Sequence, residues 1–439
     1  MESSMSTFHR FGFFAKKLRF MTIIRKDSPL MPIRHSQGIF WAAAVMMLLS
    51  ICCFEWMYTA FGQEVLHSEV RVATLLFTHM CLFSVFQLFS GSIIDYAGSK
   101  LSLPLAALCV FIGMVLQIYT DDLNFPIMLT VSQFFLTFGA SFAFIGIGYL
   151  CNGFFKESIA GIMFGFAQAS YSMCYAIVWY ISTYYEQFLK QNFNFLVWSI
   201  AAFQFTVFIT ILCTASNPAV YCTAKKNIKF SDILSSIYKM LFNSRVVLVS
   251  LIGGMEFGIF FSVAGVLLYK ASATLGSVAS LCMWTGFAIG APFFCWAYSS
   301  FLKVKSKHIF LGSSLLQSSS LLLATTLIQA VEALHPEKNW VAYAACLVAS
   351  IFGFASGGHM VAFSAGRELV DIRLITTYCA FVNGCMCVLS GIIVLILTLL
   401  SQFYRLSDML VVMSVVALLY YLLVNFMLYT RSPRSNENR

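Results

Sequence analysis

Long apolar stretches separated by short polar breaks run along most of the chain. A helix needs roughly 20 apolar residues to cross the hydrocarbon core of a bilayer, and twelve stretches approach or exceed that length. They lack the strict alternation of lipid-facing barrel strands, so each predicts a membrane-spanning helix. The predicted spans are 38–61, 72–94, 101–119, 126–150, 159–182, 194–214, 246–269, 275–299, 308–330, 340–364, 374–400 and 408–429.

The longest polar break inside this array runs from Ser216 to Arg245 and separates six predicted spans from six. Its apolar residues recur at helical spacing beside basic residues, which predicts an amphipathic helix on the cytoplasmic membrane surface, with a solvated connector as the alternative. The apolar set is Phe230, Ile233, Leu234, Ile237, Leu241 and Phe242. The predicted organisation is a basic cytoplasmic segment 1–37, a six-helix bundle 38–215, a cytoplasmic linker 216–245, a second six-helix bundle 246–429 and a cytoplasmic tail 430–439.

Composition agrees with a polytopic membrane protein. Of the 439 residues 60% are hydrophobic and 10% are charged, with a mean hydropathy of +0.83, whereas soluble domains carry about 25% charged residues. If the N-terminus is inside, 22 of the 27 Lys and Arg residues fall on cytoplasmic segments and five on outer loops. Cytoplasmic loops collect such residues, so both termini are predicted to be cytoplasmic. These cytoplasmic basic residues account for the net charge of +9, so no nucleic-acid partner is expected. We expect the protein in the plasma membrane rather than in an organelle.

Nothing in the polar segments indicates an enzyme. They are too short for a catalytic domain and contain no phosphate-binding loop, metal-ligand set or nucleophile triad, so we expect no catalytic residue, no metal and no cofactor. None of the fourteen cysteines falls in a predicted outer loop, and no disulfide is expected. The expected partners are the lipid bilayer and a small-molecule solute, with a coupled proton as an open addition. The oligomeric state stays open.

Apart from Asp408, the first residue of the last predicted span, only two acidic residues lie inside the predicted spans, Glu55 and Glu256, and they are 201 residues apart. An ionised carboxylate in hydrocarbon costs several kcal/mol unless it meets a partner or water, so both are functional candidates. At 1.5 Å per residue Glu256 lies about 15 Å beyond Val246, near mid-bilayer, and Glu55 about 25 Å beyond Gly38, nearer the outer face. Glu256 is therefore the predicted central contact, although a helix-to-helix hydrogen bond is the alternative for each carboxyl group.

Polar and aromatic residues at helical spacing indicate which helix faces line a solute path. The predicted solute contacts are Glu256, Glu55, Tyr58, Gln133, Gln168, Tyr171, Tyr175, Trp284 and Asn383. Glu256 and His79 are the candidates for proton coupling, because imidazole and carboxyl groups can exchange protons. Hydroxyl residues in the same stripes, such as Thr137 and Ser141, have an alternative role, because Ser and Thr often bond their own helix backbone.

The loop after the second predicted span carries the sequence Gly91-Ser-Ile-Ile-Asp95-Tyr-Ala-Gly98-Ser-Lys100. It resembles the cytoplasmic signature of the major facilitator superfamily, although Tyr96 and Ser99 stand where that family usually has basic residues. The resemblance implies that Gly91, Asp95, Gly98 and Lys100 act in gating. The two glycines permit a tight turn and close helix approach, and Asp95 can accept charge-assisted hydrogen bonds. A simple helix cap is the alternative role of Asp95.

A second pair of loops supports the same family. Lys156-Glu157, between the fourth and fifth predicted spans, corresponds to Arg367-Glu368, between the tenth and eleventh, at an offset of 211 residues. A duplicated six-helix unit predicts such offsets. The resemblance implies the major facilitator fold: an all-α polytopic membrane protein with 12 transmembrane helices in two six-helix pseudo-repeats, which works by alternating access around a site between spans one, four, seven and ten.

The solute class rests on finer signals. The run from Asn152 to Glu157 resembles the amino-acid facilitator branch that includes apicomplexan amino acid transporters, and Phe155-Lys156 is also similar to monocarboxylate transporters. No Lys or Arg lies within a predicted span, which counts against anionic solutes. We expect a symporter or uniporter of small amino-group-bearing solutes, above all amino acids. The alternatives are transport of a monocarboxylate, sugar or nucleoside, or a receptor of the same fold that binds solute without moving it.

Overall fold

The computed structural model describes residues 35–66, 69–120, 125–218, 230–264, 273–299, 305–334, 339–400 and 403–430. The chain divides into two compact units, Met1–His35 and Ser36–Arg439. Nearly all of the first unit lies outside the described residues, as does the predicted cytoplasmic tail after Thr430. The account below concerns the second unit.

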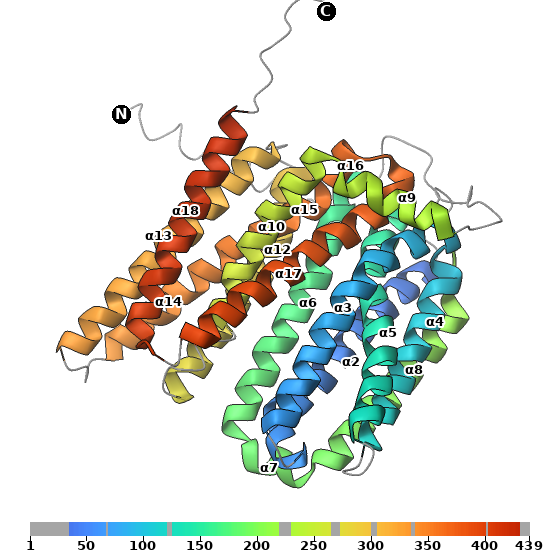
Figure 1. Cartoon of the computed structure of the whole chain (residues 1–439), viewed down its shortest axis with the longest axis horizontal. Helices are drawn as coiled ribbons and strands as arrows, with labels where there is room; N and C mark the ends of the chain where they lie inside the picture. Colours follow the sequence, from blue (N-terminus) through green and yellow to red (C-terminus); the bar gives the residue numbers. More distant parts are fainter. Residues whose placement is uncertain are drawn as a thin grey trace, which may run out of the picture. The chain divides into compact units, whose positions relative to one another are not determined.

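Each of the twelve predicted spans coincides with a long helix in Figure 1. The first half of the chain contains α2 (His35–Leu66), α3 (Glu69–Ala97), α4 (Ser99–Ile118), α5 (Phe125–Phe154), α6 (Glu157–Tyr184) and α8 (Phe193–Thr214). The second half contains α10 (Ser244–Ser262), α12 (Ala273–Ser299), α13 (Ser306–Leu334), α14 (Asn339–Ser356), α17 (Ile375–Leu400) and α18 (Leu406–Thr430). Shorter elements are α7 (Glu186–Gln191), α9 (Phe230–Leu241), η3 (Gly357–His359), α15 (Met360–Ser364), α16 (Gly366–Leu369) and η4 (Ile372–Leu374).

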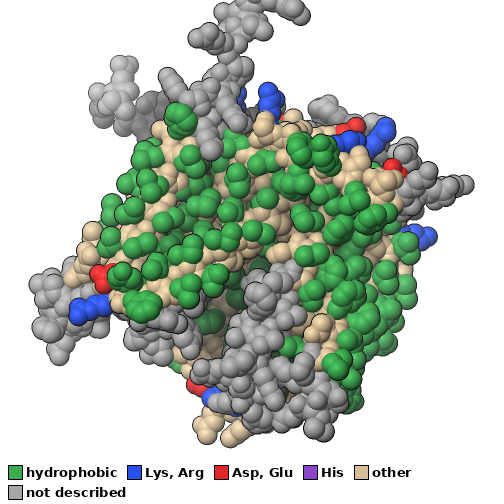
Figure 2. Space-filling model, in the orientation of Figure 1, with side chains coloured by type: hydrophobic (Ala, Val, Ile, Leu, Met, Phe, Trp, Pro, Cys, Tyr) green, Lys and Arg blue, Asp and Glu red, His purple; other side chains and the backbone are tan. Residues whose placement is uncertain are grey.

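The helices have the length and surface of a membrane protein. Within the described residues eleven helices are long and apolar enough to cross a bilayer, and α3 adds a shorter apolar stretch, Leu82–Ala97. Figure 2 shows hydrophobic side chains over the middle of the visible face, while the Lys, Arg, Asp and Glu side chains gather at its two ends. Because lipid solvates apolar side chains, this face suits a bilayer without any further partner. The chain is an integral, multi-pass membrane protein.

Each half packs mainly within itself, and two helix pairs join the halves. In the first half α4 packs against α5 and α8, and in the second half α10 packs against α17 and α13 against α14 and α18. Across the halves α6 runs along α12, and α3 runs along α17. These two pairs flank the space between the halves and position the residues of the candidate site.

The predicted span 340–364 is present as one membrane-spanning helical stretch, Tyr343–Ser364, in which the 3-10 turn η3 interrupts the α-helix between α14 and α15. Gly357 lies so close to the backbone of Gly290 and Ala291 on α12 that a Cβ atom there would clash. Two consecutive glycines weaken a helix and allow this close approach. The predicted span 246–269 is described as α10 and a wider last turn at Val263 and Ala264, and its remaining residues lie outside the described parts.

The predicted linker helix is present as α9, which packs against α3, α10 and α17. Ile233, Ser236 and Met240 form its buried face. The opposite face is apolar and exposed, with Phe230, Leu234, Tyr238, Leu241 and Phe242. We call the end of the molecule that carries α9 the linker end, and the opposite end, where α7 lies, the far end (Figure 1). The charge distribution predicts that the linker end is cytoplasmic.

Candidate functional site

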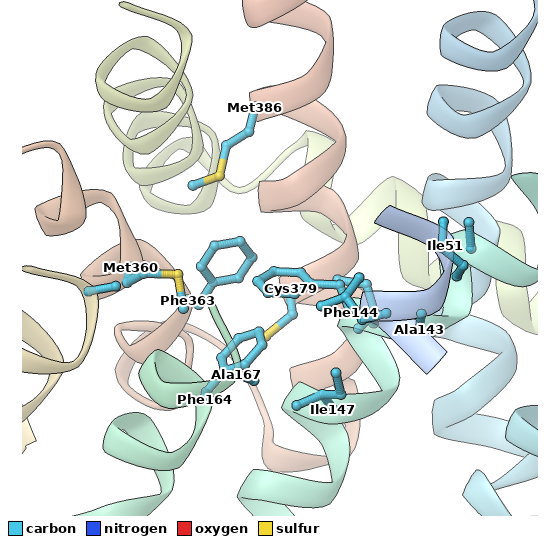
Figure 3. Close-up of a cluster of buried hydrophobic side chains, with 14 of the residues drawn as sticks. Ile51, Ala143, Phe144, Ile147, Phe164, Ala167, Met360, Phe363, Cys379 and Met386 are labelled. Carbon is cyan, nitrogen blue, oxygen red and sulfur yellow. The ribbon is translucent and has the colours of Figure 1, made fainter. Parts of the chain in front are cut away.

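An apolar plug closes the space between the halves toward the linker end (Figure 3). Its centre is a triangle of rings: Phe144 of α5 and Phe164 of α6 lie 4.7 Å apart, and Phe363 of α15 lies 5.5 and 5.3 Å from them. All three side chains are buried. Ile51, Ala143, Ile147, Ala167, Met360, Cys379 and Met386 surround the triangle. The plug therefore joins residues of both halves in one water-excluding contact.

Glycines bring the two halves into close contact at the same end. A Cβ atom at Gly165 on α6 would lie 2.7 Å from the Cα atom of Pro292 on α12, and one at Gly161 would lie 3.1 Å from the Ser364 hydroxyl. On the other flank, a Cβ atom at Gly91 would lie 2.5 Å from the Cβ atom of Ala380 on α17. Small residues permit such backbone contact between membrane helices. The predicted gating residue Gly91 thus lies directly in the contact between α3 and α17.

Asp95, at the end of α3, caps the first turn of α17 in the other half. The backbone N–H groups of Thr376 and Thr377 donate to its carboxylate at 3.3 and 2.7 Å, and the Thr377 hydroxyl donates at 2.8 Å. A helix N-terminus has unpaired N–H groups and a partial positive charge, so a carboxylate stabilises it. Here the cap comes from a residue 281 positions away in the sequence. The alternative role of Asp95 as a helix cap is therefore present, here between the two halves, and its part in gating stays a prediction.

The rest of the signature loop holds the start of the linker. Gly98 has φ +79°, a left-handed conformation suited to glycine, and a Cβ atom there would meet the side chain of Asn217. Asn217 accepts a hydrogen bond from the backbone N–H of Lys100 at 2.8 Å, and the Ser99 hydroxyl donates to the Ser216 carbonyl at 2.7 Å. Lys100, a predicted gating residue, is exposed. Sequence reasoning missed Asn217, whose only signal is an amide directly after a span.

A polar network lies beyond the plug toward the far end. Glu55 is one helical turn past Ile51 on α2, and its Oε1 lies 3.3 Å from Nε2 of His79 on α3. His79 Nδ1 lies 3.1 Å from Oε1 of Gln133 on α5, and Gln133 Nε2 donates to Oε1 of Gln117 on α4 at 2.6 Å. The structure thus joins three predicted residues, Glu55, His79 and Gln133, in one chain and adds Gln117, which sequence reasoning missed.

This network indicates which nitrogen of the His79 ring carries the proton. Gln133 uses its amide nitrogen on Gln117, so its oxygen faces His79 and accepts the Nδ1 proton. The other ring nitrogen then faces the Glu55 carboxyl at 3.3 Å. Two lone pairs facing each other repel, whereas a proton between them makes a charge-assisted bond. The geometry therefore has room for one shared proton between Glu55 and His79, and proton coupling by His79 stays a prediction.

A row of aromatic residues crosses between the halves on the other flank. Tyr175 on α6 stacks on Trp284 on α12 with ring centroids 5.0 Å apart and an interplanar angle of 22°. Tyr171 lies 5.2 Å from Tyr175, and buried Gln168 lies one turn closer to the plug on the same helix. Four predicted solute contacts, Gln168, Tyr171, Tyr175 and Trp284, are therefore brought together.

The contact between α3 and α17 contains an amide that sequence reasoning missed. Gln87 is fully buried, and neither polar atom of its side chain has a hydrogen-bond partner among the described residues. A Cβ atom on Gly384 of α17 would lie 4.0 Å from its Cγ, which places Gln87 between the halves. Half-buried Asn383, a predicted solute contact, is the neighbour of Gly384. A buried amide inside an apolar span is the signal that could have identified Gln87.

Other residues of the predicted stripes serve packing. Tyr58 is buried against Phe54 and Phe193, with ring centroids 5.0 and 5.3 Å away, inside the first half. Thr137 and Ser141 donate to carbonyl groups of their own helix, as their alternative role predicted. Contact of Tyr58 with solute stays a prediction.

Glu256 is fully buried inside the second half. Its carboxyl lies beside Ser313 of α13 and Gly358 of η3. Its contact with solute stays a prediction, because in this state the carboxyl faces its own half. The neighbouring Gly253 and Gly254 pack against Ala362, Met386 and Leu389.

The titratable groups in the described parts of the chain do not gather as a metal site: no three His, Cys, Asp or Glu residues lie together there. The Cys53 and Cys174 sulfurs lie 3.4 Å apart between α2 and α6, and both cysteines are free. What the arrangement offers is hydrogen-bonding amides, aromatic faces and one proton-holding pair on the far side of an apolar plug. Such groups bind and release a solute without forming covalent bonds.

No protein-family model and no curated protein sequence matches the chain. Solved structures match its fold. The proton:xylose symporter XylE bound to 6-bromo-6-deoxy-D-glucose aligns with a TM-score of 0.66 and 12% identity over 90% of this chain and 96% of XylE. A variant of the E. coli fucose:proton symporter FucP aligns with a TM-score of 0.62 and 11% identity over 89% and 99%. FucP in the outward conformation aligns with a TM-score of 0.61 and 12% identity over the same shares. The described helices and these alignments together establish that the chain has the major facilitator fold.

Proposed function

We propose that the chain is a proton-coupled secondary transporter of a small, neutral, hydroxyl-rich solute such as a monosaccharide. The state described here is closed at the linker end by the plug, the glycine contacts and the Asp95 cap. Figure 2 has a hollow between the halves toward the far end, beside residues that are not described. Solute enters from the far end, and alternating access carries it past the plug.

The single observation that carries the proposal is the buried amide of Gln87 between the halves. A buried amide without partners costs free energy, and a hydroxyl-rich solute would offer it both a donor and an acceptor. Two further contacts would orient a ring-shaped solute. Asn383 provides a polar contact beside Gln87, and the stacked rings of Tyr175 and Trp284 provide a flat apolar one.

Charge separates this solute class from the amino acids that the sequence favoured. A zwitterion also needs a partner for its carboxylate, and no Lys or Arg within the predicted spans supplies a charged one. Of the two glutamates expected to hold an ammonium group, Glu55 pairs with His79 and Glu256 faces its own half. The solved structures with this fold carry fucose and xylose in their names, and none of them supports the resemblance to amino-acid facilitators.

The pair of Glu55 and His79 supplies the coupling proton. Loss of the shared proton leaves two acceptors 3.3 Å apart, which favours separation of α2 from α3. Both helices belong to the first half, and α3 also forms the contact with α17. Proton release can therefore bias the contact between the halves.

Counterflow in proteoliposomes tests the function. Liposomes preloaded with hexoses, pentoses, amino acids or monocarboxylates are supplied with the labelled compound at pH 6 and pH 8. We expect exchange of at least one monosaccharide and of no amino acid. Exchange confined to amino acids or monocarboxylates contradicts the proposal, and saturable binding without flux in any arm identifies a receptor.

Gln87→Ala tests the carrying observation in the same assay. Loss of hydrogen bonds worth about 1–3 kcal/mol should raise the half-saturating sugar concentration roughly 5- to 150-fold. Thr206→Ala on α8 is the control, because that side chain is exposed and its hydroxyl donates to its own helix. An unchanged half-saturating concentration in Gln87→Ala would remove Gln87 from the site.

A further inference from the structure

We propose that Glu256, Ser313 and Gln317 form a buried binding site for Na⁺ inside the second half. The site is separate from the amides and aromatic rings between the halves. Its role in coupling rests on the transport function proposed above, whereas cation binding itself does not.

Gln317 on α13 sets the geometry. Its Nε2 donates to the carbonyl oxygen of Glu256 at 2.9 Å and to the Ser356 hydroxyl at 2.9 Å. Both partners bind the N–H groups, so the orientation of the amide is settled and its oxygen remains an acceptor. That oxygen is buried and has no hydrogen-bond partner within the described ranges.

The Glu256 carboxyl adds two more such atoms. Oε1 and Oε2 are both buried, and among the described residues the Ser313 hydroxyl is the one polar group beside them, without the geometry of a regular hydrogen bond. A Cβ atom at Gly358 would lie 2.8 Å from Oε1 and 2.6 Å from the Ser313 hydroxyl, so these two oxygens border the same small space. A side chain at position 358 would therefore crowd both oxygens. Ser313 donates to the Phe310 carbonyl at 3.3 Å and keeps its lone pairs as acceptors.

Ser313 and Gln317 lie one helical turn apart on α13, and both side chains reach the fully buried residue Glu256. Buried acceptors without donors require an explanation, and an ion is one of the few available. A proton on Glu256 would supply one donor, whereas a single cation contacts every oxygen and also balances the carboxylate charge. Hard cations prefer oxygen ligands, and one carboxylate suits a monovalent ion. Broken helices commonly line sodium sites in transporters, and the break at η3 adjoins this one.

The other titratable groups on the packed elements do not neutralise Glu256. Tyr420 on α18 donates its hydroxyl to the Ile252 carbonyl at 3.0 Å. His359 in η3 has its Nδ1 2.8 Å from the Ser356 carbonyl oxygen, and its ring lies 5.1 Å from both Phe257 and Phe287. Neither supplies a positive charge to the carboxyl.

The position of the site links it to the plug. Gly358 belongs to η3, and η3 leads directly into α15, which carries Met360 and Phe363 of the plug. An ion that ties α10 and α13 to this segment holds Phe363 in place. Release of the ion frees the segment and allows the plug to open.

The test uses purified full-length protein in nanodiscs without solute. Binding of ²²Na⁺ is measured with increasing unlabelled NaCl, and thermal unfolding is followed in NaCl against choline chloride at constant ionic strength. We expect saturable binding and a melting temperature that rises with NaCl but not with choline, because a ligand that binds the folded state stabilises it. Glu256→Gln should abolish both effects, and Ser313→Ala should weaken ²²Na⁺ affinity several-fold. Ser319→Ala, exposed on the same helix, should change neither.

Absence of saturable ²²Na⁺ binding in the wild-type protein overturns the inference whether or not the variants fold. Stabilisation by lower pH without any effect of Na⁺ assigns the site to a proton and also overturns it. Sugar counterflow reports on the proposed function separately, because it depends on Gln87 and on the hollow between the halves toward the far end. Sodium binding without sugar exchange supports the sodium site and contradicts the proposed function. Sugar exchange without sodium binding supports the proposed function and contradicts the sodium site.

Discussion

At the scale of residues, both ring nitrogens of His79 face a polar partner on another helix. It bridges a carboxylate on α2 and an amide on α5, and the amide is itself oriented by Gln117. Such outer partners fix which ring nitrogen carries the proton. The geometry therefore assigns a direction to proton exchange, toward Glu55.

Glu55→Gln tests this assignment. The amide cannot take up or release a proton, so uptake driven by an imposed pH gradient should fall at least tenfold, while counterflow exchange without a gradient continues. The measurement compares both modes in the same proteoliposomes. Ser199→Ala, an exposed hydroxyl on α8 bonded to its own helix, should leave both modes unchanged. Gradient-driven uptake that survives in Glu55→Gln would place the coupling elsewhere.

Sequence reasoning predicts a depth for the polar residues but not the direction in which their side chains point. The rise per residue places Glu256 near mid-bilayer, yet the rotation of α10 about its axis turns the carboxyl to α13 rather than to the other half. Rotation depends on which neighbour packs closest, and that is a property of the assembled bundle. The sequence prediction considered charged residues inside the spans and therefore missed three buried amides: Gln87, Gln117 and Gln317. An isolated amide inside an apolar span also indicates a functional or structural contact.

At the scale of elements, the glycines of α6 and α3 set how closely the halves approach. Gly165→Ala should hinder closure of the linker end, because its Cβ atom would lie 2.7 Å from Pro292 Cα. Overpacking costs about 1–3 kcal/mol, which shifts the population of the closed state roughly 5- to 150-fold. Gly312→Ala is the control, because no atom lies within 4 Å of a Cβ atom at that position. Equal initial uptake rates in the two variants would show that this contact does not limit closure.

The Asp95 cap makes a second prediction for the same closed state. Hydrogen bonds to a charged group contribute about 1.5–3 kcal/mol, so Asp95→Ala and Thr377→Ala should each favour opening of the linker end. Their effects should be non-additive, because both remove the same contact. A double-mutant cycle on transport rate measures the coupling. Strictly additive effects would mean that the cap does not act between these two residues.

The elements themselves were largely predictable, and their exceptions have local causes. Twelve spans and the linker helix follow from apolar length and helical spacing, which the bilayer enforces. The break at η3 does not, because it needs the close approach of α12 to Gly357. The docking of α9 on α3 through Tyr96, whose hydroxyl lies 3.0 Å from Ser236 Oγ, likewise needs tertiary contacts.

At the scale of the whole molecule, the plug determines which end is sealed. Cys379 lies within it and is buried, so a thiol reagent should leave it unmodified in the wild-type protein. Phe363→Ala removes one of three rings and should allow modification of Cys379, measured peptide by peptide with mass spectrometry. Labelling of exposed Cys213 on α8 provides the reference rate. Continued protection of Cys379 would mean that the remaining rings seal the path alone.

The contact between the signature loop and the start of the linker determines where the chain can be cut into two fragments. Asn217 and Ser216 are hydrogen-bonded to the start of α4, whereas α9 packs against α10 and α17. Two separately synthesised fragments cut between residues 218 and 230 would keep the Gly98 turn in the first and the contacts of α9 with α10 and α17 in the second, and α9 would have to dock again on α3. We expect such fragments to reassemble when co-expressed, whereas a cut ahead of Ser216 would strip the first fragment of the residues that hold its Gly98 turn.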